Sequence, residues 1–309
     1  MIKNMTTLGE VSNRVDALNQ NCHDKLVDVP AISFDSLQTM KIEGERHTLR
    51  IMAQRSIAWR LGIPYNYLAK CPPELQAKQM NHWIKGEKRE QLFIRFDGEE
   101  VRAVFTPRYK PVDNFEVLAR LDEMGYTPDS KVQCSLDGEF MLLSIPDGKR
   151  SFKINGDKMT PGISISNSEV GLASLSVSYF IYRIVCSNGL LAKTSISASY
   201  RHVSTKILSE LPHVFKKVAH GLGKQKDRLK LSLESPVADP LMTIGNFNRQ
   251  FALGEIEKLA VEWAWPQEAG ETMFHVVNTY TRAAAMEGLP AESSFRLQRV
   301  GGEVLGMLR

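Results

Sequence analysis

The feature that most limits the possible folds is a pair of short apolar runs joined by an Asp-Gly turn, which occurs twice. Residues 92–96 and 101–105 flank Asp97-Gly98, and residues 131–136 and 139–145 flank Asp137-Gly138. An Asp-Gly pair between such runs is a strong β-hairpin signal, because both residues tolerate the positive φ that tight hairpin turns need. The middle of the chain is therefore predicted to fold as antiparallel strands.

Further along, residues 173–186 predict one long strand, and Asn188-Gly189 predicts the turn after it. Residues 161–166 and 194–200 supply two more strand candidates. Within the long strand, Arg183 stands in an otherwise apolar row, so its guanidinium must be paired with an acid or face a groove. A structural ion pair and a phosphate contact are both open for this residue.

Helical spacing dominates both ends of the chain. Leu8, Val11, Val15 and Leu18 recur at helical intervals in a first segment that reads as helical to about residue 90. Asn114 is predicted to cap a helix through residue 124, and residues 205–288 and 293–308 are predicted to be helical. The expected fold is α+β, with a central, largely antiparallel curved sheet of hairpins flanked by N- and C-terminal helices. The expected regions are 1–90 (helical), 91–204 (β-rich core) and 205–309 (helical), which can form one compact domain.

Composition excludes several classes of protein. The chain of 309 residues is 43% hydrophobic and 24% charged, which suffices for a buried core. It has no apolar run of the roughly 18 residues that a membrane span needs and no secretory signal, so a cytoplasmic location is expected. Its 4 cysteines lie far apart, which favours neither a zinc site nor a disulfide framework.

The charge is unevenly distributed along the chain. Residues 201–230 hold eight basic and two acidic residues, although the whole chain carries a net charge of only +4. Clustered positive charge suits a polyanion partner, because neutralising phosphates depends on local rather than total charge. A solvated helix face explains the same cluster.

Basic residues beside aromatic ones give the candidate nucleic-acid contacts. Hydroxyls, rings and guanidinium groups together can hold phosphates and stack on bases, whereas exposed polar strand edges give the same pattern without a ligand. The candidates are Arg108, Tyr109, Lys110, Lys149, Arg150, Lys153, Arg183, Tyr200 and Arg201.

Two other activities remain as alternatives. Residues 54–68 resemble a helix-turn-helix, with Gly62 ending one helix and Pro64 opening the next, which would place Tyr65 and Asn66 at the start of the recognition helix. Pro72-Pro73, however, shortens this second helix. Asp129 and Asp147 echo the carboxylates of metal-dependent nucleases, but Asp147-Gly148 is typical of a turn rather than a strand. No hydrolase, zinc-protease or dinucleotide motif is present, so no cofactor, metal or enzyme activity is expected.

Several stretches resemble the phage- and plasmid-borne proteins grouped as "domain of unknown function 932". They are residues 61–64 with 67–68, 105–114, 183–188, 201–202, 278–283 and 297–305. The resemblance implies a mobile genetic element, cytosolic residence and no assigned enzyme chemistry. Members often carry a His-Asp-Gly-Ser-like loop where this chain has residues 167–171, which puts any role of that loop in doubt.

The order of helices, hairpins and helices is also similar to that of phage single-strand annealing proteins, which assemble as rings or filaments. The resulting hypothesis is a single-stranded DNA-binding and annealing protein that acts in recombination as a homo-oligomer, without contact to a membrane. A sequence-specific duplex binder, a metal-dependent nuclease and a protein-binding role without nucleic acid are the alternatives.

Overall fold

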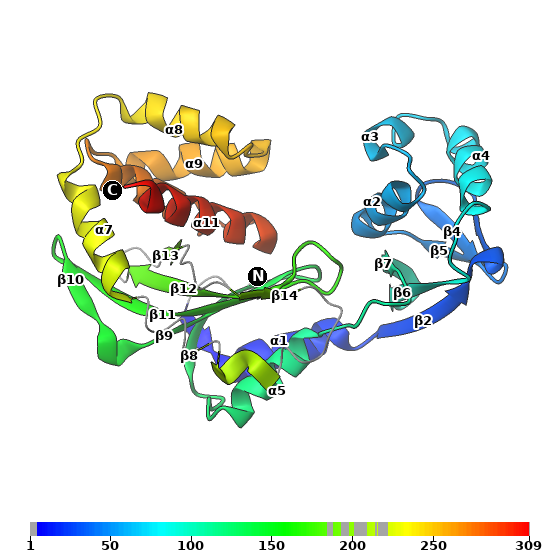
Figure 1. The fold of residues 1–309 in the computed structure, drawn as a ribbon, viewed down its shortest axis with the longest axis horizontal. Helices are drawn as coiled ribbons and strands as arrows, with labels where there is room; N and C mark the ends of the chain where they lie inside the picture. Colours follow the sequence, from blue (N-terminus) through cyan, green and yellow to red (C-terminus); the bar gives the residue numbers. More distant parts are fainter. Residues whose placement is uncertain are drawn as a thin grey trace.

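The computed structural model describes residues 5–183, 188–192, 198–200, 209–213, 215 and 222–308. Within these ranges the chain forms two lobes, each with its own buried hydrophobic cluster (Figure 1). We call residues 22–110 the N-terminal lobe. The sheet lobe comprises the described residues on either side of it.

The N-terminal lobe combines two small antiparallel sheets with three helices. One sheet has the order β2 (Cys22–Asp28), β6 (Gln91–Asp97), β7 (Glu100–Phe105), and the other has β3 (Ile32–Phe34), β4 (Thr39–Ile42), β5 (Glu45–Thr48). The helices are α2 (Ile51–Arg60), α3 (Tyr65–Leu68) and α4 (Pro73–Ile84). Ile57, Leu68 and Met80, one from each helix, are fully buried in the cluster that joins helices and sheets.

The sheet lobe is built on eight strands, and every pair in it is antiparallel. The order is β1 (Met5–Thr7), β8 (Lys131–Leu136), β9 (Met141–Pro146), β11 (Asp157–Asn167), β12 (Leu175–Arg183), β13 (Asn188–Ala192). In addition, β10 (Phe152–Ile154) pairs with β11, and β14 (Ala198–Tyr200) pairs with β12.

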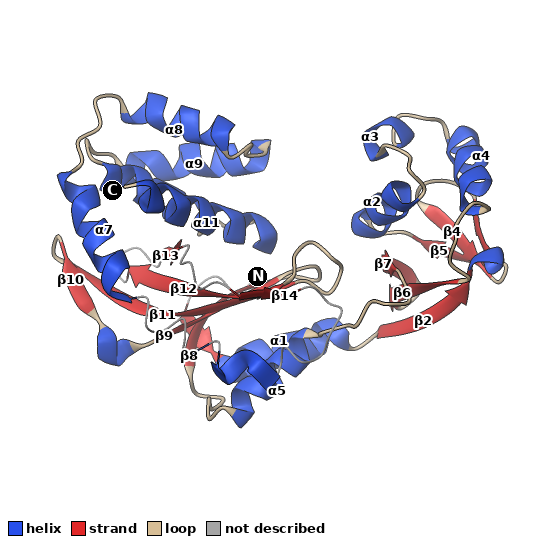
Figure 2. Ribbon diagram, in the orientation of Figure 1, coloured by secondary structure: helices blue, strands red, loops and turns tan. Residues whose placement is uncertain are grey.

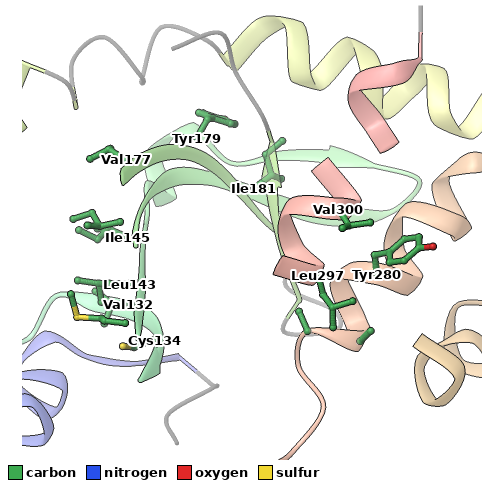
Figure 3. Packing of buried hydrophobic residues seen from close by; sticks show 14 of the residues in the cluster. Val132, Cys134, Leu143, Ile145, Val177, Tyr179, Ile181, Tyr280, Leu297 and Val300 are labelled. Carbon is green, nitrogen blue, oxygen red and sulfur yellow. The ribbon is translucent and has the colours of Figure 1, made fainter. Parts of the chain in front are cut away.

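Helices cover both faces of this sheet (Figure 2). On one side lie α1 (Leu8–Asn19) and α5 (Asn114–Glu123); on the other lie α7 (Leu222–Glu234), α8 (Pro240–Gln250), α9 (Glu255–Glu268), α10 (Met273–Ala283) and α11 (Ala291–Met307). Strand alternation accounts for the three layers, because successive side chains point to opposite faces. Val177, Tyr179 and Ile181 of β12 belong to the large cluster seen in Figure 3, whereas Phe180 joins a separate cluster with α11.

The predicted α+β class is confirmed, with antiparallel sheets between N- and C-terminal helices. The expectation that residues 1–90 are helical was wrong, because β1 to β5 lie within them. These strands are only three to seven residues long, and β2 is polar and exposed over most of its length, so it carries no clear period-2 signal. Asn188-Gly189 is also not a turn: the two residues open β13, paired with Arg183 and Tyr182 of β12.

The buried clusters group the chain differently from the three predicted regions. Residues from Val27 to Val104 share one cluster, whereas Leu8, Val11 and Val15 of α1 pack into the sheet lobe. In the described part of the chain, no helix is long and apolar enough to cross a membrane.

Candidate nucleic-acid interface

A groove of about 690 Å³ runs along the N-terminal lobe where β6 begins and β7 ends. Because the two strands pair antiparallel, the residues before β6 lie next to those after β7. The groove is lined by residues 88–91 and 106–108. We call it the basic groove, because Lys88, Arg89 and Arg108 contribute three cations to it and only Glu90 contributes a carboxylate.

The cations of the basic groove are exposed, and their partners leave an excess of positive charge. Lys88 and Arg108 have no ion pair among the described residues. Arg89 lies 2.9 Å from Glu87, whose carboxylate is buried and is also 3.5 Å from Arg60. Glu87 is thus shared between two guanidinium groups, and the groove keeps a surplus of cations for an anionic ligand.

Aromatic side chains are found near the groove, but Tyr109 does not have the open ring face that the sequence predicts. Tyr109 is stacked on Phe105 with ring centroids 3.8 Å apart, and its hydroxyl donates to the carbonyl of Glu169 at 3.5 Å. Burial raises the pKa of the Tyr109 hydroxyl. Its ring therefore fixes the loop after β7 instead of offering an open face to a base. An exposed ring lies five residues before the groove in the chain, where Trp83 near the end of α4 is 54% exposed.

The second hollow is a cavity of about 940 Å³ between the sheet and the C-terminal end of α5. We call it the sheet-face pocket. Ile145, Ile163 and Tyr179, from the adjacent strands β9, β11 and β12, point to the same sheet face and line it. Tyr126, just after α5, and Phe215 add aromatic rings 6.4 Å apart. Apolar side chains thus make up most of its interior.

Polar groups in this pocket occur at its rim and at one buried point. The rim holds Arg120, Lys149 and Arg150, with Arg150 3.3 Å from Asp147. Inside, Tyr179 is 2% exposed, and its hydroxyl has no hydrogen-bond partner among the described residues. Burial raises the pKa of this hydroxyl, which stays protonated and available as a donor.

Of the predicted contact residues, the basic connection remains together and exposed. Lys149 and Arg150 follow β9 at the rim of the sheet-face pocket, and Lys153 lies on the exposed side of β10. Arg108 and Lys110 are exposed after β7, in the N-terminal lobe. Tyr200 lies in β14 opposite Leu175, and Arg201 lies outside the described residues.

Arg183 was predicted as a phosphate contact, and the structure shows that it is ion-paired within the protein instead. Its guanidinium lies 2.6 Å from Asp157 and 2.7 Å from Glu268, and it stands over the ring of Phe274 at 5.5 Å. Burial alone would raise the pKa of Glu268, but Arg282 and Arg183 outweigh burial and lower it. Arg183 therefore ties β12 to α9 as a structural ion pair, the alternative that the sequence left open.

A buried ionic network at the junction of the lobes was not predicted. Arg95 of β6 lies 2.9 Å from Asp24 and 2.7 Å from Asp113, which directly precedes α5 in the sheet lobe. Arg102 of β7 lies 2.5 Å from Glu169. Both arginines are about 4% exposed, so these bonds connect the lobes in a largely water-free environment.

Glu169 is the centre of this interlobe network. Its second carboxylate oxygen accepts the backbone N–H of Asn114 at 2.8 Å, and its carbonyl accepts from Arg95 at 3.1 Å. Burial raises the pKa of the nearby Asp113 to about 6, with Arg95 opposing and Glu169 adding to the rise. The loop of residues 167–171, whose role the sequence left in doubt, thus serves to join the two lobes.

The alternative sites do not take the geometry that their chemistry needs. Gly62, with φ at +71°, ends α2 as predicted, but α3 has only four residues, fewer than a DNA-reading helix uses. Asp147 accepts the backbone N–H of Lys149 at 3.1 Å in a turn. Across the described ranges, no three His, Cys, Asp or Glu side chains are placed to hold a metal ion.

Sequence reasoning missed Lys88, Arg89 and the Tyr179 hydroxyl. The run Lys85-Gly86-Glu87-Lys88-Arg89 is a local basic signal that could have marked the groove. The Tyr179 hydroxyl carries no such signal, because its lack of a partner depends on packing between distant segments.

Residues 101–227 match the family described as "Domain of unknown function (DUF932)". These residues belong to the DUF932 family. The DUF932 segment contains every side chain described above for the sheet-face pocket, together with Arg102, Asp113 and Glu169 of the interlobe network. No curated protein and no solved structure matches the chain.

Proposed function

We propose that this DUF932 protein binds single-stranded DNA through the basic groove and promotes annealing in the recombination of a mobile element. The observation that carries the proposal is the convergence of Lys88, Arg89 and Arg108 on one groove with a single opposing carboxylate. Clustered cations hold a strand by its phosphates, and such contacts carry no sequence preference.

Binding by the phosphates suits annealing in particular. A strand held by its backbone in a shallow basic groove keeps its bases directed outward, where a complementary strand can reach them. Trp83 supplies a nearby ring for transient stacking. Lys149, Arg150 and Lys153 form a second exposed basic segment on the sheet lobe, through which a homo-oligomer, a ring or a filament, would extend the contact along the strand.

The salt dependence of binding gives a quantitative test. For single strands the logarithm of affinity falls with the logarithm of salt concentration by about 0.7 for each phosphate neutralised. The double variant Lys88→Ala and Arg108→Ala removes two groove cations, so the slope should become shallower by about 1.4. Fluorescence anisotropy of a labelled strand of about 40 nucleotides, at several salt concentrations, measures it.

The matched control is Arg46→Ala with Lys258→Ala, which removes two exposed cations away from the groove and should leave the slope unchanged. Mixing complementary strands with protein should speed duplex formation, and the groove variant should lose this acceleration. Equal slopes for the groove variant and wild type would refute the site. Tighter binding to the duplex than to the single strand would refute the function.

A further inference from the structure

We infer that the sheet-face pocket holds one unstacked nucleotide, with its base inside the pocket and its phosphate at the basic rim. This deepens the proposed function for a nucleotide within a strand, and a free nucleotide is the second source of the same chemistry. The pocket and the basic groove lie on different lobes, so each can be tested without the other.

The interior of the pocket suits a flat, mostly apolar group. Its volume of about 940 Å³ falls within the range of small-molecule sites and leaves room for base, sugar and phosphate. Ile145 and Ile163 form an apolar floor on adjacent strands, paired directly opposite one another. Tyr126 and Phe215 present rings at 66° to each other, so a planar group can meet one face-on and the other at its edge.

The buried hydroxyl of Tyr179 selects a base over a hydrocarbon. A buried donor without a partner is unfavourable, and a ligand with an acceptor at that point would satisfy it. Nucleobases carry ring nitrogens and carbonyl oxygens along their edges, whereas an alkyl chain would leave the hydroxyl unpaired. The ligand therefore combines a flat body with an acceptor on its inner edge.

The rim suits a single phosphate. Arg120, Lys149 and Arg150 provide three cations, and Glu123 and Asp147 provide two carboxylates, so the rim carries a net charge of about +1. One phosphodiester, with one negative charge, balances this excess. Arg120 and Arg150 are held by these carboxylates, while Lys149 extends into solvent and is able to reach the phosphate.

Two variants and one control test the inference. Tyr179→Phe removes only the hydroxyl, and Ile163→Trp fills the pocket. Tyr280→Phe is the control, because Tyr280 is equally buried but lies in α10 with its hydroxyl bonded to Ile244 and Asn248. Tyr179→Phe is expected to fold even if Ile163→Trp does not, because no described group pairs with the lost hydroxyl. Circular dichroism and thermal melting check that each variant is folded.

The probes are deoxyadenosine monophosphate, followed by titration calorimetry, and a 40-nucleotide strand with one internal 2-aminopurine, followed by its emission. We expect Tyr179→Phe to weaken nucleotide binding about tenfold, Ile163→Trp to abolish it, and Tyr280→Phe to leave it unchanged. On the strand, insertion unstacks the probe base and raises its emission in wild type but not in Ile163→Trp. A response from the strand alone supports a nucleotide within DNA, and a response from the mononucleotide alone supports a free nucleotide.

Absence of both responses, or equal affinities for wild type and Tyr179→Phe, would overturn the inference. So would binding of dodecanoate, a purely aliphatic anion, in place of the nucleotide. If anisotropy still shows salt-dependent strand binding that requires Lys88 and Arg108, the basic groove stands and only the pocket fails. If the mononucleotide binds while the strand does not, the pocket stands and the proposed function fails.

Discussion

Replacing Glu169 by glutamine should reveal how strongly the two lobes are joined. Glu169 is 5% exposed and pairs with Arg102, whose side chain is 4% exposed. Glutamine keeps the shape and can still accept the backbone N–H of Asn114, but it leaves the Arg102 charge without its carboxylate. Removing one partner of a buried ion pair costs about 3–5 kcal/mol. The free energy of unfolding should fall by that amount.

The charge origin of this loss can be separated from packing by a double-mutant cycle. Arg102→Met removes the other partner, and the pair of changes should cost at least 1 kcal/mol less than the two single losses added together. Linear extrapolation from urea denaturation at pH 7 supplies all four free energies. Glu123→Gln is the control, since it breaks the exposed pair with Arg120 and should change stability by less than about 0.5 kcal/mol.

A loss below about 1 kcal/mol for Glu169→Gln, or strict additivity in the cycle, would show that the Arg102–Glu169 pair contributes little to joining the lobes. The slope of the unfolding free energy against urea concentration gives separate information on whether the lobes unfold together. A shallower slope, or two transitions in place of one, would show that the lobes unfold separately once the network is broken.

Three further predictions concern individual side chains. Tyr179→Phe removes a buried donor without a partner and should not lower stability, whereas Tyr280→Phe, which loses the hydroxyl bonded to Ile244 and Asn248, should cost about 1–2 kcal/mol; urea denaturation measures both. The pKa of Asp113 is raised to about 6, so the folded state binds the proton of this carboxyl more tightly than the unfolded state does. The free energy of unfolding should therefore fall as the pH rises from about 4 to about 6, by at most about 3 kcal/mol. Asp113→Asn should remove this pH dependence, and an unchanged profile would contradict the shift. Arg183→Met should cost about 3 kcal/mol by leaving Asp157 and Glu268 short of a cation; a cost near zero would rule out a structural role for the pair.

The two hairpins, one in each lobe, and the long strand β12 could be predicted because their signals are local. Asp97-Gly98 and Asp137-Gly138 each join two paired strands, and the alternation along residues 175–183 matches the two faces of β12. Arg183, which stands in an otherwise apolar row, is predicted from the sequence to be ion-paired or to face a groove. In the structure it is ion-paired with Asp157 and Glu268. The last predicted helix, residues 293–308, corresponds to α11 (Ala291–Met307).

What could not be predicted depends on segments that meet only in three dimensions. Strands β2 and β6 pair across about seventy residues of chain, with Asp24 opposite Arg95. No pattern near Asp24 in the sequence predicts that pairing. Tyr109 was predicted to stack on a base, but Phe105 takes that position, because the loop after β7 folds back on its own strand. The basic groove itself forms from two segments that lie about twenty residues apart in the chain.

The position of the family boundary has a practical consequence for exchanging parts between relatives. The DUF932 match begins at residue 101, inside β7, so it separates this strand from its partner β6. A fragment limited to residues 101–227 would expose an unpaired strand edge, and Arg102 would lose the covering provided by the N-terminal lobe. It would also lack α11, which packs over the sheet. Chimeras should therefore exchange β6 and β7 as one hairpin and carry the C-terminal helices with the sheet.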